Sequence, residues 1–168
     1  DPDKLSWLNE HYIKNTPPKE LALHLEPFLI GKGILQEGHG LDVGEIAKVI
    51  PSLNQRAKTV AEMAEKSAFY FKKEVEFDEK AKAKFLVPEA RPLLEKAIAG
   101  LSLLDNFSAE DIEALFNQVV KEEGMKLGKL AQPIRVALTG ATVSPGIYDV
   151  ILLLGKEESL KRLNQALP

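Results

Sequence analysis

The residue types that carry out chemistry in proteins are few in this sequence and do not form catalytic patterns. There is no cysteine, which excludes disulfides and cysteine-ligated zinc. The three histidines, His11, His24 and His39, are widely spaced and lack a His-Glu-x-x-His pattern. We therefore interpret them as ordinary surface or core histidines rather than as metal ligands.

Two glycine-containing segments could be mistaken for phosphate-binding loops. Residues 31–36 lack the third glycine of a dinucleotide fingerprint and no strand precedes them. Residues 155–157 lack the upstream glycine and the Ser/Thr of a phosphate loop. We interpret both as helix termini. The acidic pairs Glu122-Glu123 and Glu157-Glu158 fall on expected exposed helical turns, so the sequence contains no complete active site.

One stretch combines positive charge with a complete lack of acidic residues. Residues 124–148 contain no Asp or Glu but include Lys126, Lys129 and Arg135, whereas the whole chain carries a net charge of −3. Proteins that bind nucleic acid through bulk charge are usually basic, so an RNA contact here would need a local patch. Composition alone favours the alternative, a solvated helix face.

The same stretch contains residue types suited to reading an RNA base. Ser144 can cap a helix that Pro145 begins, which would leave the first amides of that helix facing an acceptor on RNA. Arg135 lies one helix away and has a planar fork that can bond a base edge. Physical chemistry alone nevertheless favours a simple pair of helices joined by a turn.

The elements that must position these residues are predicted to be helices. Hydrophobic residues make up 45% and charged residues 28% of the 168 residues, which is typical of a globular domain. Apolar spacing and capping signals predict an all-α fold of about nine to ten helices. The principal ones are expected near 5–13, 17–29, 42–50, 57–71, 93–104, 108–123, 126–139, 146–154 and 157–167, with a kink at Pro133.

Local signals also predict where these helices begin and how the chain divides. Thr16 is expected to cap the second helix with Pro17 at its first position, and Asp42 to cap the third. The charged, irregular residues 72–79 suggest two helical subdomains in tandem, 1–77 and 78–168. The longest aliphatic run, 150–154, is too short for a membrane helix. No signal peptide or initiator Met is present, so we expect an excised piece of a longer, membrane-free protein.

Three separate blocks resemble the C-terminal region of bacterial glutamyl-tRNA synthetases, which are class I aminoacyl-tRNA synthetases. Residues 128–157 follow the family's order of Gly-Lys, Pro-Leu/Ile-Arg, Ala-Leu-Thr-Gly, Ser/Thr-Pro-Gly and Leu-Gly-Lys-Glu. Residues 4–13 resemble its Leu-x-Trp-Leu-Asn-x-x-Tyr-Ile element, and residues 55–60 its Glu-Arg-x-Lys-Thr-Leu helix. Gln55, Val60 and Ile134 depart mildly from these patterns.

The resemblance implies a two-part helical module that holds the anticodon loop of the glutamate tRNA. It implies that the second and third anticodon bases contact Arg135 and the turn formed by Ser144, Pro145, Gly146 and Ile147. Arg56 is the candidate reader of the first base. Lys126, Lys129 and Lys58 are the expected phosphate contacts, which would provide affinity without base choice.

The resemblance also carries expectations for the parent protein. That protein would be a monomeric, cytoplasmic ligase that joins glutamate to its tRNA using ATP and Mg²⁺. The family's two catalytic motifs, of the His-Ile-Gly-His and Lys-Met-Ser-Lys-Ser types, do not occur in these residues. We therefore expect no catalytic residue, cofactor or metal site in this chain, and expect the parent's catalytic domain to be a partner of it.

Two alternatives remain open from the sequence. The chain could be a helical protein-interaction module of a duplicated synthetase that no longer binds tRNA, although such a module would not need Arg135 beside Ser144 and Pro145. The parent could also be non-discriminating and charge glutamine tRNA as well. Arg56 favours the discriminating alternative, because a base-reading arginine would prefer one first base.

Overall fold

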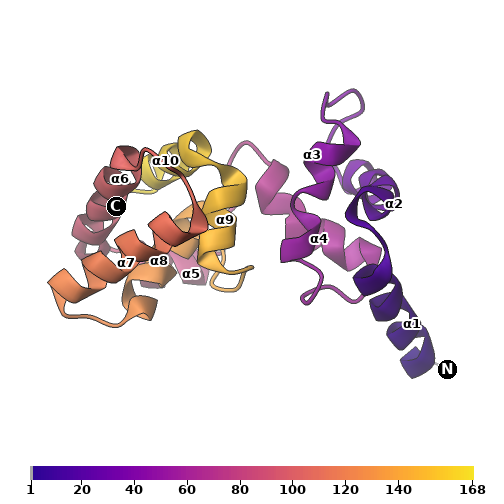
Figure 1. The fold of residues 1–168 in the computed structure, drawn as a ribbon, viewed down its shortest axis with the longest axis horizontal. Coiled ribbons are helices and arrows are strands. Elements are labelled where there is room, and N and C mark those ends of the chain that lie inside the picture. The colour runs from indigo at the N-terminus through magenta and orange to yellow at the C-terminus, as the bar shows by residue number, and fades with distance from the viewer. Residues whose placement is uncertain (1) are drawn as a thin grey trace. The chain divides into compact units, whose positions relative to one another are not determined.

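The structure is a computed structural model that describes residues 2–168, and in the first helix it describes the side chains of residue 4 and of residues 9 onward. Within residues 2–168 every regular element is a helix, which confirms the predicted all-α class (Figure 1). No helix in this range is long and apolar enough to span a membrane. The elements are α1 (Pro2–Asn15), α2 (Pro18–Gly31), α3 (Val43–Ala47), η1 (Ile50–Ser52), α4 (Val60–Phe71), α5 (Glu79–Phe85), η2 (Pro88–Ala90), α6 (Arg91–Leu103), α7 (Ala109–Glu123), α8 (Leu127–Thr139), α9 (Ile147–Leu154) and α10 (Lys156–Gln165).

The chain forms two compact units, Asp1–Lys73 and Glu74–Pro168. The division expected from the sequence, between residues 77 and 78, lies slightly further along the chain. Residues 74–78 group with the second unit, where the backbone N–H of Asp78 donates to the carbonyl oxygen of Gly140 at 2.9 Å. That each unit binds its own part of an anticodon loop remains a prediction.

In the first unit, α2 lies at the centre and packs against α3 and α4. Its side chains Leu21, Leu25 and Leu29 recur every four residues and are completely buried. They form one core with Ile46, Ile50, Leu53 and Met63. The apolar spacing of Leu5 and Leu8, used to predict the first helix, concerns side chains outside the described residues.

The capping prediction is correct for Asp42 and wrong for Thr16. The Asp42 Oδ1 atom accepts from the backbone N–H of Glu45 at 2.8 Å. The second helix starts one residue later than expected, at Pro18, and its N-cap residue Pro17 has no side-chain cap. The reason is that the Thr16 hydroxyl is used elsewhere, because it donates to the carbonyl oxygen of Tyr12 at the end of α1.

The fourth helix starts later than the sequence pattern suggests. Residues 53–59 form turns and bends, so the block 55–60 that resembles a family helix contributes only its last residue to α4. Thr59 ends this irregular segment, since its extended backbone and its Oγ1, which accepts from the Glu62 N–H at 3.0 Å, begin the helix. Arg56 and Lys58 therefore lie on a turn that precedes the helix.

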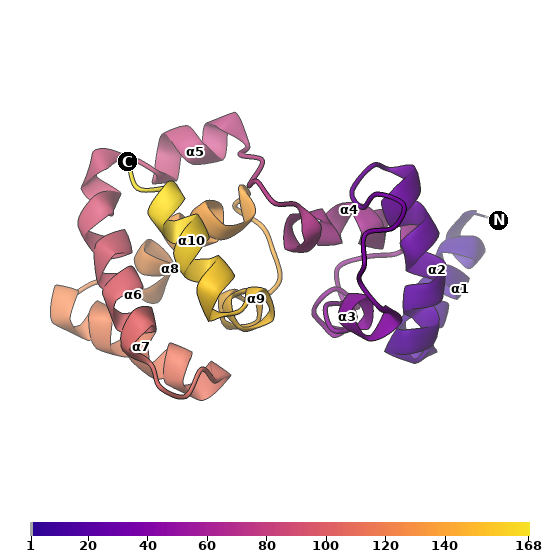
Figure 2. The same ribbon diagram turned by 90° about the horizontal axis from the view of Figure 1, so that it is seen from above.

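In the second unit, α8 is the central element and contacts α5, α6, α7, α9 and α10 (Figure 2). Pro133 lies inside α8, and the predicted kink there remains a prediction. A continuous series of α8 side chains is buried: Leu130, Ala131, Pro133, Ile134, Val136, Ala137, Leu138 and Thr139. Residues 136–138 are therefore buried helix, whereas in the aliphatic run 150–154 only Val150 and Ile151 are buried.

Helix α5 is absent from the sequence prediction, which expects no helix between residues 71 and 93. Its sequence, with alternating Lys and Ala, has little apolar patterning. The helix depends on two local contacts: Asp78 Oδ2 accepts from the Ala81 N–H at 2.9 Å, and the Ala81 side chain is buried. Short helices of this kind are stabilised by packing, so periodicity does not reveal them.

The predicted boundaries of α7 are confirmed at both ends. Ser108 Oγ accepts from the Asp111 N–H at 3.2 Å, and Gly124 ends the helix in the left-handed conformation with φ of 62°.

Replacing Ser108 by Ala should lower the free energy of unfolding by about 1 kcal/mol, because the helix loses its N-cap acceptor. Ser102→Ala is the matched control: its hydroxyl donates to the carbonyl of Ala99 on the exposed surface of α6, where removal leaves no donor unpaired. Urea unfolding followed by circular dichroism would measure both variants. Equal stability of the two would contradict the capping role of Ser108.

Candidate nucleic-acid interface

The structure brings together three of the residues singled out in the acid-free stretch. Arg135, half-buried near the end of α8, donates through Nη1 to the Ser144 hydroxyl oxygen at 2.7 Å. The same nitrogen donates to the Pro145 carbonyl oxygen at 3.1 Å. The arginine therefore joins the last turn of α8 to the segment that leads into α9.

Ser144 does not cap α9, contrary to the sequence prediction. The N-cap residue is Gly146, without a side-chain cap, and the helix begins at Ile147 rather than Pro145. The Ser144 hydroxyl donates instead to the Pro145 carbonyl oxygen at 2.7 Å and accepts from Arg135. Because both of these bonds are internal, Ser144 serves to fix the turn.

The turn presents backbone rather than large side chains at the start of α9. Ser144 and Pro145 are buried, Gly146 is exposed, and the Ile147 side chain is only 6% exposed. The first N–H groups of any helix lack an acceptor within the helix. A contact from Ile147 to a ligand would therefore use its main chain, and its side chain instead anchors the helix in the core.

The loop between α8 and α9 is held at its start by Thr139 and Gly140. The Thr139 hydroxyl donates to the Arg135 carbonyl oxygen at 2.7 Å and accepts from the Ala141 N–H at 3.2 Å. Gly140 caps α8 with φ of 81°. Further along, Val143 is 76% exposed, so the tip of this loop projects an apolar side chain into solvent.

Arg162 of α10 is a contributor that the sequence analysis missed. It is only 2% exposed, and its Nη1 donates to the Leu138 carbonyl oxygen at 2.8 Å. Its Nε donates to Glu158 Oε1 at 2.9 Å. A cation here satisfies a terminal carbonyl of α8 and lies at the negative end of that helix dipole. No local pattern around Arg162 signals this role, because its partner is far away in the sequence.

Two of the three lysines predicted as phosphate contacts lie at the opposite end of α8 from Arg135. Lys126 is the N-cap residue and Lys129 lies in the first turn. Both side chains are exposed, and neither forms an ion pair with the described residues. They are available to a polyanion, but the structure does not bring them into contact with the Arg135 turn.

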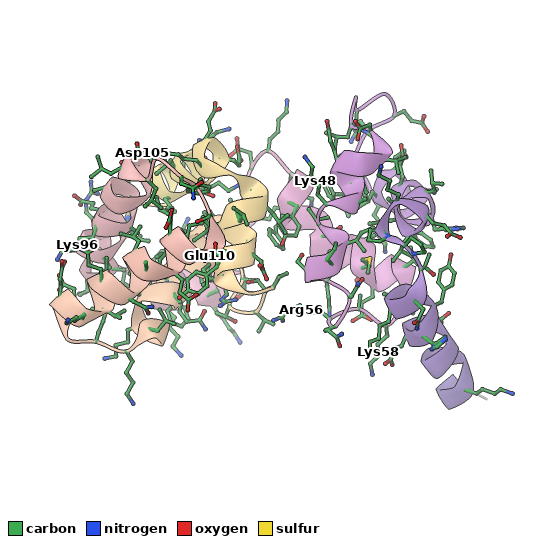
Figure 3. All side chains as sticks on the ribbon, viewed as in Figure 1. Lys48, Arg56, Lys58, Lys96, Asp105 and Glu110 are labelled. Atoms are coloured by element: carbon green, nitrogen blue, oxygen red, sulfur yellow. The ribbon has the colours of Figure 1, made fainter. Side chains whose placement is uncertain are left out.

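Arg56 and Lys58 belong to the first unit, on the turn that precedes α4, and both are exposed (Figure 3). Lys66 Nζ donates to the Arg56 carbonyl oxygen, and the Lys58 N–H donates to Glu62 Oε2 at 3.2 Å. Lys66 also hydrogen-bonds the Glu62 carboxylate. This bond, and after it the bond from the Lys58 N–H, lower the pKa of Glu62. The Thr-x-x-Glu spacing from Thr59 to Glu62 is the sequence signal that could have predicted that Glu62 bonds the backbone of this turn.

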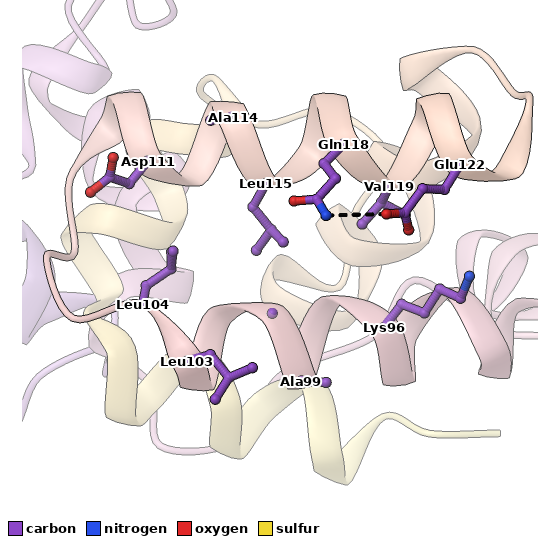
Figure 4. Close-up of a pocket in the computed structure, with 11 residues that line it drawn as sticks. Lys96, Ala99, Leu103, Leu104, Asp111, Ala114, Leu115, Gln118, Val119 and Glu122 are labelled. Atoms are coloured by element: carbon purple, nitrogen blue, oxygen red, sulfur yellow. Dashed lines mark hydrogen bonds between the residues drawn. The ribbon is translucent and has the colours of Figure 1, made fainter.

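A groove of about 520 Å³ between α6 and α7 is a second place where a ligand could be sought (Figure 4). Its walls are mainly apolar, and Gln118 Nε2 donates to Glu122 Oε1 at 3.1 Å. Lys96 pairs with Glu123, and that hydrogen bond raises the pKa of Lys96. No His, Cys or Ser lines the groove, and no cluster of three or more metal-ligating side chains occurs among the described residues. Its ionisable side chains are those of Lys96, Asp111 and Glu122.

A match to a known domain family gives the class to which this chain belongs. The family described as "Anticodon binding domain" matches residues 20–167. Since that match covers most of the chain, the chain belongs to the anticodon binding domain family.

The relatives described next are ligases of one kind. This chain is 47% identical over 167 residues to a glutamate--tRNA ligase of Syntrophobacter fumaroxidans and 46% identical over 167 residues to one of Geotalea uraniireducens. Each match covers 99% of this chain and 35% of the relative. A crystal structure of a glutamate tRNA ligase from Elizabethkingia meningosepticum superposes with a TM-score of 0.84 at 26% identity, over 99% of this chain and 32% of that one. The chain thus spans about a third of the length of the relatives that it matches, and corresponds to their anticodon-binding part.

Tyr148, beside the turn, should make stability sensitive to alkaline pH. Its hydroxyl is buried without a hydrogen-bond partner among the described residues, and its ring packs edge-on against Phe116 at 5.3 Å between ring centroids. Burial, and to a lesser degree the charge of Glu113, raises the pKa of Tyr148 above its ordinary value of 10.0. Because the unfolded chain ionises first, the stability provided by the neutral tyrosine is complete below pH 10 and is lost as the pH rises through the folded pKa.

Tyr148→Phe should therefore leave the free energy of unfolding at pH 7 within about 1 kcal/mol of the wild-type value, since an unpaired hydroxyl is removed. It should also reduce the loss of stability above pH 10. Urea unfolding at pH 7 and at alkaline pH would test this, with Tyr12→Phe as the control because Tyr12 is 41% exposed. A loss of several kcal/mol at pH 7 would show that the hydroxyl has a partner.

Proposed function

We propose that this chain reads the anticodon loop of the glutamate tRNA, using the loop 140–146 and the start of α9 for the second and third bases. The observation that carries the proposal is the pair of bonds from Arg135 to Ser144 and Pro145, within a stretch that has no acid until Asp149. The relatives' shared name, glutamate--tRNA ligase, indicates the tRNA.

The chemistry of the turn favours a base edge over a phosphate. Asp149 is an acid in the first turn of α9, and a side chain added at Gly146 would touch its Oδ2 at 3.4 Å. That carboxylate repels a phosphate but accepts hydrogen bonds from a base. The N–H groups of the same helix turn donate to base carbonyls, so the two together can distinguish one base from another.

In this proposal the internal bonds of Arg135 are part of base recognition. They fix both the guanidinium plane and the turn before RNA arrives, so that little conformational freedom is lost on binding. A guanidinium held in this way can stack on or bond to a splayed base. Arg56 in the first unit would read the first base, with Lys58 on a neighbouring phosphate.

The wider assignment is also a proposal, supported by the relatives' shared name and by the family resemblance of the sequence. The complete protein would join glutamate to its tRNA with ATP and Mg²⁺, as a cytoplasmic monomer, through a catalytic domain that these residues do not include. This chain's contribution would be to select the tRNA.

The first test is a titration of the chain with glutamate tRNA and with versions altered at one anticodon position at a time. We expect the native anticodon to be preferred, and the preference to persist from 50 to about 200 mM salt because base contacts release few counterions. Arg135→Ala and Arg135→Lys should both reduce the preference at the second and third positions by roughly 5- to 150-fold, the value of a bidentate base contact.

Arg135→Lys is informative because it keeps the charge and loses the planar fork. Arg56→Ala is the matched variant in the other unit and should affect the first position alone. Equal binding of all the tRNAs by the wild-type chain would reject base reading. It would also support the alternative of a protein-interaction module if binding itself were undetectable.

Lys126 and Lys129 should contribute affinity without base choice. The double variant Lys126→Ala/Lys129→Ala should weaken binding to native and altered tRNAs by the same factor. It should reduce the slope of log affinity against log salt by about 1.4 to 1.8, the value for two phosphate contacts. The control is Lys80→Ala/Lys84→Ala, at two exposed positions of α5, which changes the net charge by the same amount. A changed anticodon preference in the Lys126/Lys129 variant would contradict a phosphate role.

A further inference from the structure

The segment that precedes α5 lies directly against the start of the loop between α8 and α9. The backbone N–H of Asp78 donates to the Gly140 carbonyl oxygen at 2.9 Å. A Cβ atom built on Gly140 would overlap the Glu76 carbonyl oxygen and lie 2.8 Å from the Glu76 carbonyl carbon. Two stretches of backbone that are distant in the sequence therefore meet with no side chain between them.

Gly140 is required at this contact for two independent reasons. Its φ of 81° is in the left-handed region, which side chains other than glycine's rarely adopt. The neighbouring atoms are backbone, and they cannot rotate away as the end of a side chain can. By contrast, a Cβ at Gly124, the other left-handed helix cap in this unit, would meet nothing within 4 Å. The close approach is therefore particular to Gly140.

The position of Gly140 determines the path of the residues that follow it. Its own N–H closes α8 by donating to the Val136 carbonyl oxygen at 2.8 Å, while its carbonyl oxygen is held by Asp78. The loop is also held by Thr139, through its bond to Ala141, and by Arg135, through its bonds to Ser144 and Pro145. If the Asp78 contact is lost, the peptide that starts the loop can rotate.

We infer that residues 76–78 are a positioning element for base recognition, with the Asp78 backbone N–H and Gly140 as the joint through which they orient the loop 140–146. This inference rests on the proposed function of that loop. The contact uses main-chain atoms, so the identity of residues 76–78 matters less than the presence of the N–H and the absence of a side chain at 140. The segment does not touch RNA in this account and acts only through the loop.

The matched variants Asp78→Ala and Asp78→Pro isolate the joint. Both lose the side-chain cap of α5, in which Asp78 Oδ2 accepts from Ala81, but only proline also loses the N–H that bonds Gly140. The φ of Asp78 is −63°, which proline adopts without strain, so α5 can still begin at Glu79. The proline Cδ would also occupy the place of that N–H against the Gly140 carbonyl oxygen, so a difference between the two variants reports on disruption of the whole joint.

Two measurements on these variants test the inference. In NMR spectra without RNA, the amide resonances of residues 141–146 should move in Asp78→Pro and stay near the wild-type positions in Asp78→Ala. The preference for native over altered second and third anticodon bases should fall by about five- to tenfold in Asp78→Pro only, the effect of losing one ordering hydrogen bond. Unchanged loop resonances in Asp78→Pro, or an equal preference in both variants, would overturn the inference.

A measurement on the wild-type chain keeps the test valid even if the proline variant does not fold. Binding of the glutamate tRNA should slow hydrogen exchange of the Asp78 amide, because coupling between a joint and its loop is reciprocal. The Ala90 amide, which bonds the Val87 carbonyl in the same unit, is the control and should not change. An Asp78 amide that exchanges equally with and without bound tRNA contradicts the coupling. A wild-type chain that shows no anticodon preference instead rejects the proposed function, whereas the NMR comparison without RNA still decides whether the joint exists.

Discussion

The burial of α8 is the constraint on which the second unit depends. From Leu130 to Thr139 nearly every side chain of this helix is inside, so the helix can be surrounded on most sides by others (Figure 2). A helix buried in this way has carbonyl groups at its C-terminal end that need partners without access to water. Arg162, Thr139 and the Gly140 cap supply them, and the same groups determine where the following loop leaves the helix. Stabilising the helix end and building the candidate site are thus one requirement.

Much of this organisation could be read from the sequence because it is encoded locally. The apolar spacing in α2 and α7, the caps at Asp42 and Ser108 and the stop at Gly124 depend on residues within one or two turns of each other. The same signals wrongly predicted Thr16 and Ser144 as helix caps. Their hydroxyls instead donate to nearby backbone carbonyl oxygens. The hydroxyl of a serine or threonine identifies a possible cap but not which of several partners it will bond.

The parts that were missed depend on contacts between distant residues. Arg162 bonds a carbonyl of α8, and Asp78 bonds Gly140, in each case across many residues. Helix α5, whose charged sequence has no clear apolar face, exists because this docking and the Asp78 cap support it. Residues 55–59 were expected to be helical from the family resemblance and from the apolar spacing that begins at Ala57, but they form a turn and Thr59 starts the helix only afterwards. The resemblance to a family identified Arg56 and Lys58 on this turn but not their local geometry, and it identified neither Arg162 nor Asp78.

The bond from Arg162 to Leu138 has a consequence for how the protein is made. Helix α10 follows α8 and its loop along the chain, so a ribosome releases Arg162 only after the whole of α8, the turn and α9. Until then the Leu138 carbonyl has no buried cation to satisfy it, and the end of α8 must remain hydrated. The bond that completes the end of α8 therefore forms late in synthesis, after all the residues of the loop 140–146 have been added, and a nascent chain paused before α10 would lack it.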